Sequence, residues 1–212
     1  LAGMAYRQYL EPQMKNVEVP FEGLRIGQQK KALLQKLKEN VIKLTLKIIK
    51  EVNPDVVINN AGFVGHTLWS IAVNGVAAAH LMLGFHKKMK RGHIITISSL
   101  SADFKGFEKM SRSYEGIAYV CGKAMASSCS QQLANMRSKP VNVVCIEPGI
   151  VKTNMHPEVN LPTYVDPDQW DNSVYTPLMP SDIVNTIDWA LNQPPWVNIN
   201  LIKLNTNSTL TK

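Results

Sequence analysis

The sequence predicts an α/β fold in which a parallel sheet carries helices on both faces. Three short apolar runs predict strands, namely Val56–Ile58, Ile94–Ile97 and Val141–Ile146. Each run ends in small, glycine-containing or hydroxyl-bearing residues and is followed by a helical segment. Strands that alternate with helices are typical of parallel sheets with crossover helices. Because ligands bind beyond the carboxyl ends of such strands, we expect the functional site at that edge of the sheet.

The first 51 residues predict helix, strand and helix. Residues 1–16 form a helix broken near Pro12, and Val17–Phe21 fits a short strand. Residues 28–51 have apolar side chains at helical spacing, with a phase slip between Asn40 and Thr45. The slip favours two helices, or a missing connection, over one straight helix.

Two helices follow the first two predicted strands. The first spans about Thr67–Lys90, and the second contains Tyr119 and continues to Arg137. After the third strand, residues 154–180 are rich in proline, asparagine and aspartate, which predicts a loop over the cleft that could cover a substrate.

The C-terminal part predicts one more helix and one more strand. Ser181 is the expected N-cap of an amphipathic helix that Pro194 and Pro195 end. Val197–Leu204 is the expected last strand, followed by a polar tail over residues 205–212.

Composition bounds the class of protein. With 212 residues, of which 45% are hydrophobic, we expect a single domain over residues 1–212. No apolar run approaches the roughly 18 to 20 residues that span a bilayer, and the first residues do not resemble a signal peptide. We therefore expect a cytoplasmic protein without a membrane span. The five histidines show no metal-ligand spacing, so no metal is expected.

The net charge of +7 raises the alternative of nucleic-acid binding. The densest basic cluster, residues 86–91, follows an apolar helical run, and cations in the last turn of a helix complement its dipole. No aromatic residues are interleaved with this cluster. A solvated helix end is therefore favoured, and no nucleic-acid partner is expected.

Tyr119 and Lys123 are the first candidate catalytic pair. In a helix, residues four apart point to one face. The pKa of a free tyrosine is about 10, and a nearby cation favours the phenolate, so the phenol becomes a proton donor or acceptor nearer neutral pH. Ser99, where a strand ends, could add a hydrogen bond to a substrate oxygen. A surface contact is the alternative for such a pair, but the three residues together predict proton transfer for an alcohol and carbonyl pair.

Several motifs, in order over about residues 56–204, resemble the short-chain dehydrogenase/reductase family. Asn59–Gly62 resembles the family segment beside the adenosine side of the cofactor, and Pro148–Thr153 resembles the loop that meets the nicotinamide. The residues that resemble the catalytic tetrad are Asn74, Ser99, Tyr119 and Lys123. The resemblance implies a Rossmann-like doubly wound sheet. It also implies an NAD(P)(H)-dependent oxidoreductase that interconverts a secondary alcohol and a ketone or aldehyde by hydride transfer.

The resemblance also implies a role for each matching residue. Tyr119 would pass the proton, while Lys123 would lower the pKa of Tyr119 and bind the nicotinamide ribose. Ser99 would hold the substrate oxygen, and Asn74 would fix a water that links Lys123 to solvent. The implied cofactor contacts are Asn60, Ala61, Gly62, Tyr119, Lys123, Pro148, Gly149, Val151 and Thr153.

Arg25 favours NADP over NAD, because NADP-preferring members of the family place a basic residue there for the 2′-phosphate. A solvated helix start is the alternative explanation for this basic residue. The ending Gln193–Asn200 is similar to the subgroup of NADP-dependent 3-hydroxy acid dehydrogenases and small carbonyl reductases. Family members are commonly homodimers or homotetramers. The small residues Ala118, Gly122, Ala126 and Cys129 would permit close helix packing, either across subunits or within one.

Three features depart from the family pattern. The glycine-rich turn that seats the pyrophosphate is absent, so we expect a sequence that is truncated before Leu1 or joined from separate segments. Asn74 follows Gly62 early, and residues 103–113 look like an insert near the cleft. The missing turn supports an alternative function, a catalytically inactive member that serves as a binding or structural subunit.

Overall fold

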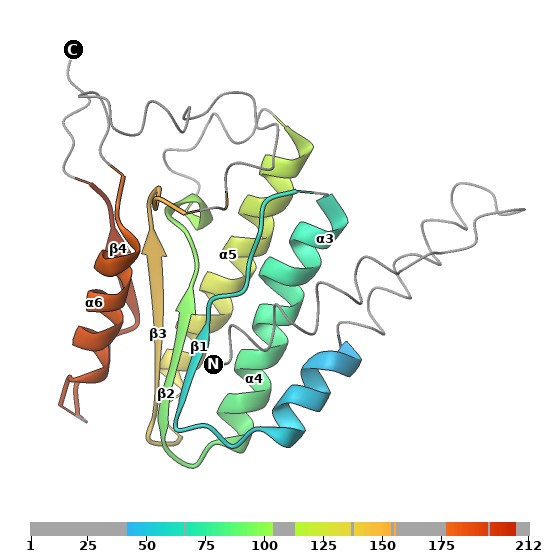
Figure 1. The fold of residues 1–212 in the computed structure, drawn as a ribbon. Coiled ribbons are helices and arrows are strands. Elements are labelled where there is room, and N and C mark those ends of the chain that lie inside the picture. Colours follow the sequence, from blue (N-terminus) through green and yellow to red (C-terminus); the bar gives the residue numbers. More distant parts are fainter. Residues whose placement is uncertain are drawn as a thin grey trace, which may run out of the picture.

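The described part of the chain contains one four-stranded parallel sheet. The computed structural model describes residues 42–65, 67–103, 113–136, 138–153, 155, 177–194 and 196–206. The strands are β1 (Val56–Asn59), β2 (Gly92–Ile97), β3 (Val141–Pro148) and β4 (Leu201–Leu204), in the order β1-β2-β3-β4 (Figure 1). The predicted parallel α/β fold is confirmed. A single domain over all 212 residues stays a prediction.

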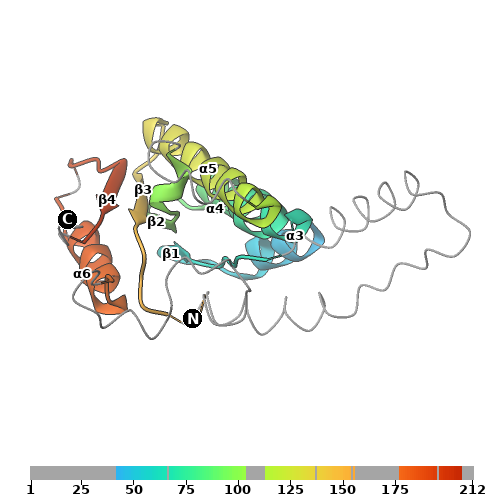
Figure 2. The same cartoon turned by 90° about the horizontal axis from the view of Figure 1, so that it is seen from above.

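Helices cover both faces of this sheet (Figures 1 and 2). On one face lies a helical run made of α3 (Thr67–Ile71), the π-helix η1 (Ala72–Ala77) and α4 (Ala78–Lys88), with α5 (Tyr114–Asn135) beside it. On the other face lies α6 (Pro180–Leu191). The π-helical stretch was not predicted.

The two faces of β2 and β3 enclose two apolar clusters, which explains why these strands are continuous apolar runs. Ile94 and Val143, both fully buried, pack with α4 and α5. Their neighbours Ile95 and Val144 pack with Ala190 of α6. Successive side chains of a strand point to opposite faces, so both faces of these central strands need apolar residues.

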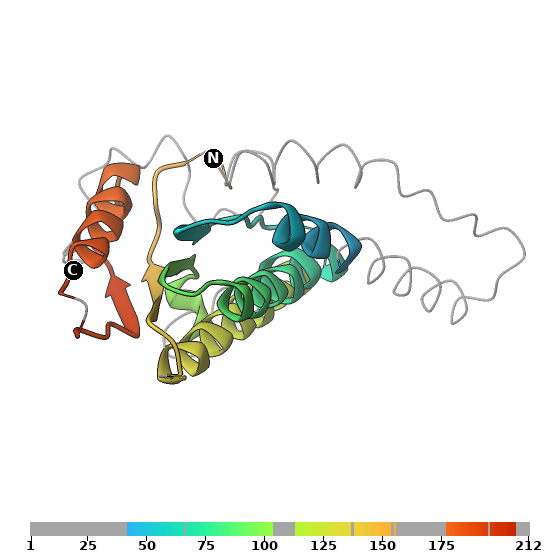
Figure 3. The same cartoon turned by 90° about the horizontal axis from the view of Figure 1, so that it is seen from below.

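The helix of residues 42–51 packs on α4 (Figure 3). A Cβ added at Gly84 would lie 2.2 Å from Ile49 Cδ1, so the two helices approach where α4 lacks a side chain. The Lys88 ammonium donates to the carbonyls of Ile49, Lys50 and Val52. Lys88 thus satisfies carbonyls at the end of that helix, and it belongs to the basic cluster that the sequence interpreted as a solvated helix end.

Two glycines let α5 pack closely on η1. A Cβ at Gly75 would lie 3.2 Å from Gly122 Cα, and a Cβ at Gly122 would lie 2.9 Å from Asn74 Cβ and 3.1 Å from the Ser70 carbonyl oxygen. Of the two possibilities left open for the small residues of this helix, Gly122 therefore serves packing within the chain.

Replacing Gly122 by alanine should lower the free energy of unfolding by about 1 to 3 kcal/mol, because the new methyl group overpacks this contact. In an unconstrained helix the same change is stabilising by roughly 0.5 to 1 kcal/mol, so even the sign is informative. Urea unfolding measures it. Ser128→Ala at an exposed position of α5 is the control and should stay within about 0.5 kcal/mol of wild type. Equal or greater stability of Gly122→Ala would contradict the close packing.

Two predicted boundaries are wrong. Helix α6 begins at Pro180 with Met179 as its N-cap, and the Asp182 carboxylate accepts from the Met179 N–H at 2.7 Å, so Ser181 is not the cap. The last strand is shorter than Val197–Leu204, because its pairing with β3 begins at Leu201, opposite Cys145. Predictions for residues 1–41 and 104–112, and for residues 156–176 of the loop over the cleft, lie outside the described residues.

The sequence was expected to contain no segment long and apolar enough to cross a membrane, but the helical run Thr67–Lys88 meets both criteria. It has 22 residues, and its most apolar window of 18 residues has a mean hydropathy of 1.5. Just over half of its apolar window, 56%, is buried inside the protein, and Leu81, Met82 and Phe85 belong to the core. A core helix passes the same test, so length and composition are weak support for a membrane span here.

Candidate functional site

The structure brings the candidate residues to one edge of the sheet, where the strands have their carboxyl ends, here called the carboxyl edge. Strand register aligns Asn59 of β1 with Thr96 of β2 and with Cys145 of β3. The segments that follow these residues, 60–62, 98–99 and 148–149, therefore leave the sheet at the same edge. Helix η1 and helix α5 add the other candidate side chains.

Lys123 is held in a buried position behind this edge. Its side chain reaches the end of β2, where Nζ donates to the Ile97 carbonyl oxygen at 2.8 Å, and the residue is only 4% exposed. The Ser98 hydroxyl donates to the Lys123 carbonyl oxygen at 2.9 Å. Burial lowers the pKa of Lys123 to about 8. The ammonium is therefore fixed in place and close to losing its proton.

Tyr119 lies beside Lys123, one turn earlier on α5, as the four-residue spacing predicted. The Lys123 Nζ lies 5.8 Å from the centroid of the phenol ring. Burial raises the pKa of Tyr119, and a hydrogen bond with the Ser99 side chain opposes this. The rise differs from the expectation that Lys123 lowers this pKa. Desolvation of the phenolate is the larger effect, and the ammonium donates to Ile97.

Ser99 occupies the turn that follows β2. Its backbone is still extended, with φ −164° and ψ 151°, and it is the N-cap of the short helix η2 (Leu100–Ala102). The Ser99 Oγ accepts from the Ser101 N–H at 3.2 Å and from the Ser101 hydroxyl at 2.8 Å. The hydroxyl thus has a defined position next to Tyr119.

Asn74 is buried in η1 and uses its side chain to hold the segment after β1. Its Oδ1 accepts from the Phe63 N–H at 3.0 Å. Its Nδ2 donates to the Phe63 carbonyl at 2.8 Å and to the Ser70 hydroxyl at 2.9 Å. A water held by Asn74 stays a prediction, and the described side-chain bonds all go to protein groups.

Gly62 lies between Asn74 and Lys123. A Cβ at this position would be 2.9 Å from Asn74 Oδ1 and 3.2 Å from Lys123 Nζ. Any side chain would therefore fill the space beside the ammonium. Its neighbours Asn60, which is exposed, and Ala61, which is half-buried, complete the segment that the sequence assigned to the cofactor.

The predicted nicotinamide loop begins where β3 ends. The Gly149 N–H donates to the Leu204 carbonyl at 2.8 Å, and a Cβ there would lie 2.8 Å from Asn205 Oδ1. Val151 forms a bridge with Leu178, and the Thr153 hydroxyl accepts from the Met155 N–H at 3.4 Å. Pro148 is thus the last residue of β3, and Gly149, Val151 and Thr153 follow it at the carboxyl edge. Arg25 lies outside the described residues.

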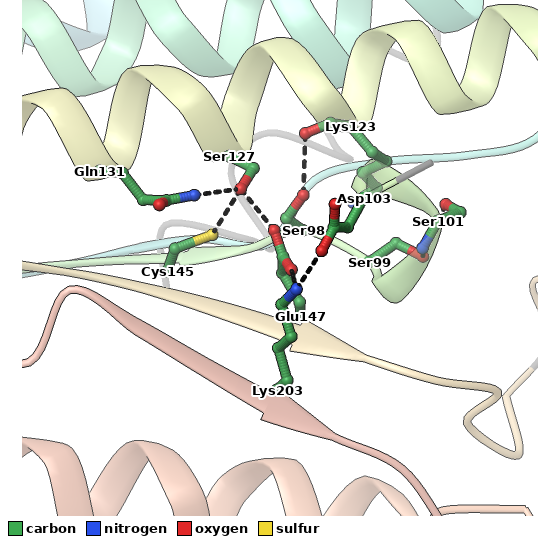
Figure 4. A network of polar contacts seen from close by, with 10 residues as sticks. All are labelled: Ser98, Ser99, Ser101, Asp103, Lys123, Ser127, Gln131, Cys145, Glu147 and Lys203. Carbon is green, nitrogen blue, oxygen red and sulfur yellow. Dashed lines mark hydrogen bonds and ion pairs between the residues drawn. The ribbon is translucent and has the colours of Figure 1, made fainter. Parts of the chain in front are cut away.

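A polar network behind the site was missed by the sequence interpretation (Figure 4). Glu147, 2% exposed, accepts from the Ser127 hydroxyl, which in turn accepts from Gln131 Nε2 at 3.0 Å. Lys203 of β4 has its Nζ 3.8 Å from Glu147 Oε2 and pairs with Asp103, which raises the pKa of Lys203. The available signal was a carboxylate inside an apolar strand, since a buried charge needs partners.

Comparison with known proteins places this geometry in a family context. Residues 30–163 match the family model described as short chain dehydrogenase, a segment that contains Asn74, Ser99, Tyr119 and Lys123. A serine 3-dehydrogenase of Rhizobium radiobacter is 27% identical in an alignment of 167 positions that covers 71% of this chain and 63% of that protein. The chain therefore spans less than two thirds of the length of this relative.

Solved structures share the fold. The closed form of a serine dehydrogenase complexed with NADP+ matches with a TM-score of 0.58 and 20% identity, covering 85% of this chain and 82% of that one. An alcohol dehydrogenase of the archaeon Thermococcus sibiricus, complexed with 5-hydroxy-NADP, matches with a TM-score of 0.56 and 20% identity, covering 82% and 72%. At these identities the likeness concerns the fold, and it agrees with the parallel sheet described above.

Proposed function

We propose that this chain, which belongs to the short-chain dehydrogenase family, is an NADP(H)-dependent oxidoreductase that interconverts an alcohol and a carbonyl compound. The observation that carries the proposal is the arrangement of a buried phenol, a buried ammonium and a hydroxyl at the carboxyl edge. The ring centroid of Tyr119 is 5.8 Å from Lys123 Nζ, and the Ser99 side chain opposes the rise in the pKa of Tyr119 that burial causes. Such a group can move a proton to or from a substrate oxygen.

Each side chain has one task in the proposed reaction. Tyr119 Oη accepts the proton of the substrate hydroxyl during oxidation and returns it to the carbonyl oxygen during reduction. Ser99 Oγ donates a hydrogen bond to the same substrate oxygen. The positive charge of Lys123 favours the phenolate whenever Tyr119 has given up its proton. The nicotinamide, when bound, supplies the hydride acceptor or donor.

Residues of this chain fit the cofactor. Gly62 keeps the space beside Lys123 Nζ free of a side chain, which suits a lysine that binds a ribose. We assign the cofactor contacts to Asn60, Ala61, Gly62, Tyr119, Lys123, Pro148, Gly149, Val151 and Thr153, with Arg25 at the 2′-phosphate. Two of the similar solved structures are complexes with NADP+ and with 5-hydroxy-NADP, which supports NADP over NAD.

Small hydroxy acids and alcohols are the proposed substrates. The support is the name of the serine 3-dehydrogenase relative, together with the ending Gln193–Asn200 that is similar to the 3-hydroxy acid dehydrogenase subgroup. We further propose a cytoplasmic homodimer or homotetramer with no nucleic-acid partner. Sedimentation velocity tests the oligomeric state.

The first test is a titration with NADPH and with NADH, followed by tryptophan fluorescence and then by turnover of NADP+ with L-serine and with 2-propanol. The proposal expects selective binding of NADPH and turnover with at least one substrate of a panel of small hydroxy acids and alcohols. Binding without turnover across the panel would favour the catalytically inactive alternative. Binding of neither cofactor would contradict the proposed function.

A further inference from the structure

We propose that Ser101 is a positioning residue, which holds the Ser99 hydroxyl so that its proton points toward Tyr119 and the substrate oxygen. This inference rests on the proposed function and concerns the orientation of one group in that site. Ser101 was not among the residues that the sequence singled out.

The geometry gives Ser101 two contacts with one oxygen. Both its N–H, at 3.2 Å, and its hydroxyl, at 2.8 Å, donate to Ser99 Oγ. Ser101 is 1% exposed, so water does not compete freely for its hydroxyl. These contacts come from the turn of η2 itself, in which Ser99 is the N-cap.

The two contacts use the whole acceptor capacity of Ser99. A serine hydroxyl has two acceptor lone pairs and one proton. When Ser101 occupies both lone pairs, Ser99 can act toward any third group only as a donor. This agrees with the effect of the Ser99 side chain on Tyr119: burial raises the pKa of the phenol, and Ser99 opposes that rise, as a donor to the phenol oxygen would.

The turn that carries Ser101 is held on both sides. The Ala102 N–H donates to the Ser99 carbonyl at 2.9 Å, and the Asp103 N–H donates to the Leu100 carbonyl at 3.2 Å. Asp103 also pairs with Lys203, which joins η2 to β4 (Figure 4). The backbone position of Ser101 therefore does not depend on its own hydroxyl, and removing that hydroxyl should leave the turn in place.

The test uses the full chain with ¹³C at the Cζ atom of tyrosine, because the chemical shift of this atom responds to hydrogen bonding at the phenol. The Tyr119 signal is identified by its loss in Tyr119→Phe. We expect Ser101→Ala to move this signal in the direction in which Ser99→Ala moves it, and to add nothing in the Ser99→Ala background. The control is Ser130→Ala, which removes a fully buried hydroxyl from a different element, α5. It should leave the signal at its wild-type position.

Kinetics supply a second readout wherever the wild type turns over NADP+. Ser101→Ala should then lower kcat about 10-fold, because Ser99 would no longer be held in place to donate its hydrogen bond to the substrate oxygen. The KM for NADP+ should stay unchanged. A Tyr119 signal unmoved by Ser101→Ala, or by Ser99→Ala, would overturn the inference. The ¹³C measurement needs no substrate. An inactive wild type would therefore count against the proposed function and not against the role of Ser101.

Discussion

Replacing Tyr119 by phenylalanine is expected to lower kcat for alcohol oxidation by about 10² to 10⁴, the range that a positioned acid or base contributes. Only the phenol oxygen is removed, and the buried ring keeps its packing. Removal of the phenol oxygen should change the free energy of unfolding by only about 1 kcal/mol, the usual size of one polar contact. Steady-state turnover with NADP+ measures the effect, and NADPH titration checks that the cofactor site is intact.

The matched control for this change lies on the same helix. Tyr114, at the start of α5, is 81% exposed, so Tyr114→Phe should have the kcat and the stability of the wild type. Wild-type kcat in Tyr119→Phe would sink the proposed role of the phenol. A loss of both turnover and folding would point instead to a structural role.

Replacing Lys123 by methionine is expected to change how stability depends on pH. The pKa of Lys123 is lowered from 10.5 to about 8 by burial, so between these values the unfolded chain holds a proton that the folded chain has released. Stability rises with pH wherever the unfolded state binds more protons. As the pH rises from 7 to above 10.5, the free energy of unfolding of the wild type should therefore increase by roughly 3 kcal/mol relative to that of Lys123→Met.

Denaturant unfolding of both proteins across this pH range measures that gain as a difference. The comparison is needed because burial raises the pKa of Cys145 to about 12 and that of Tyr119 as well, which lowers stability above pH 9 in both proteins. Lys90→Met, at an exposed position, should run parallel to the wild type. Parallel curves for wild type and Lys123→Met would show that the buried ammonium is not destabilised. Turnover should be lost in Lys123→Met at every pH.

The central strands β2 and β3 and their parallel order could be predicted because burial on both faces demands apolar side chains at most positions. Ile94 and Ile95 show this directly, since they belong to different clusters. Strand β4 was less predictable, because hydrogen bonding to β3 decides where it begins and the apolar residues before Leu201 continue without pairing. The predicted N-cap of α6 was wrong because Pro180 can occupy the first turn of a helix, so the helix begins before Ser181.

Within the site, spacing along the chain predicted what one helix turn determines, namely that Tyr119 and Lys123 share a face. It could not predict the balance of burial and charge that sets the pKa of Tyr119, because this depends on which groups from other elements surround the phenol. The Glu147 network could not be predicted either, since its members come from α5, β4 and the end of η2. Contacts of this kind exist only after the sheet has assembled.

The π-helical turn η1 determines which side chains of the helical run Thr67–Lys88 face the interior. Its buried positions recur every four residues, as in Ser70, Asn74, Ala78, Met82 and His86. In a regular α-helix, four residues advance by about 400°, so such a stripe would wind away from the sheet by roughly 40° at each step. The wider turn of η1 takes up part of this drift. Regular α-helical winding over the twelve residues from Ser70 to Met82 would turn these two side chains about 120° apart. Both are fully buried, so the wider turn keeps α3 and α4 in phase with the interior. Winding residues 72–77 as a regular α-helix without removing a residue would therefore turn Met82 or Ser70 out of the core.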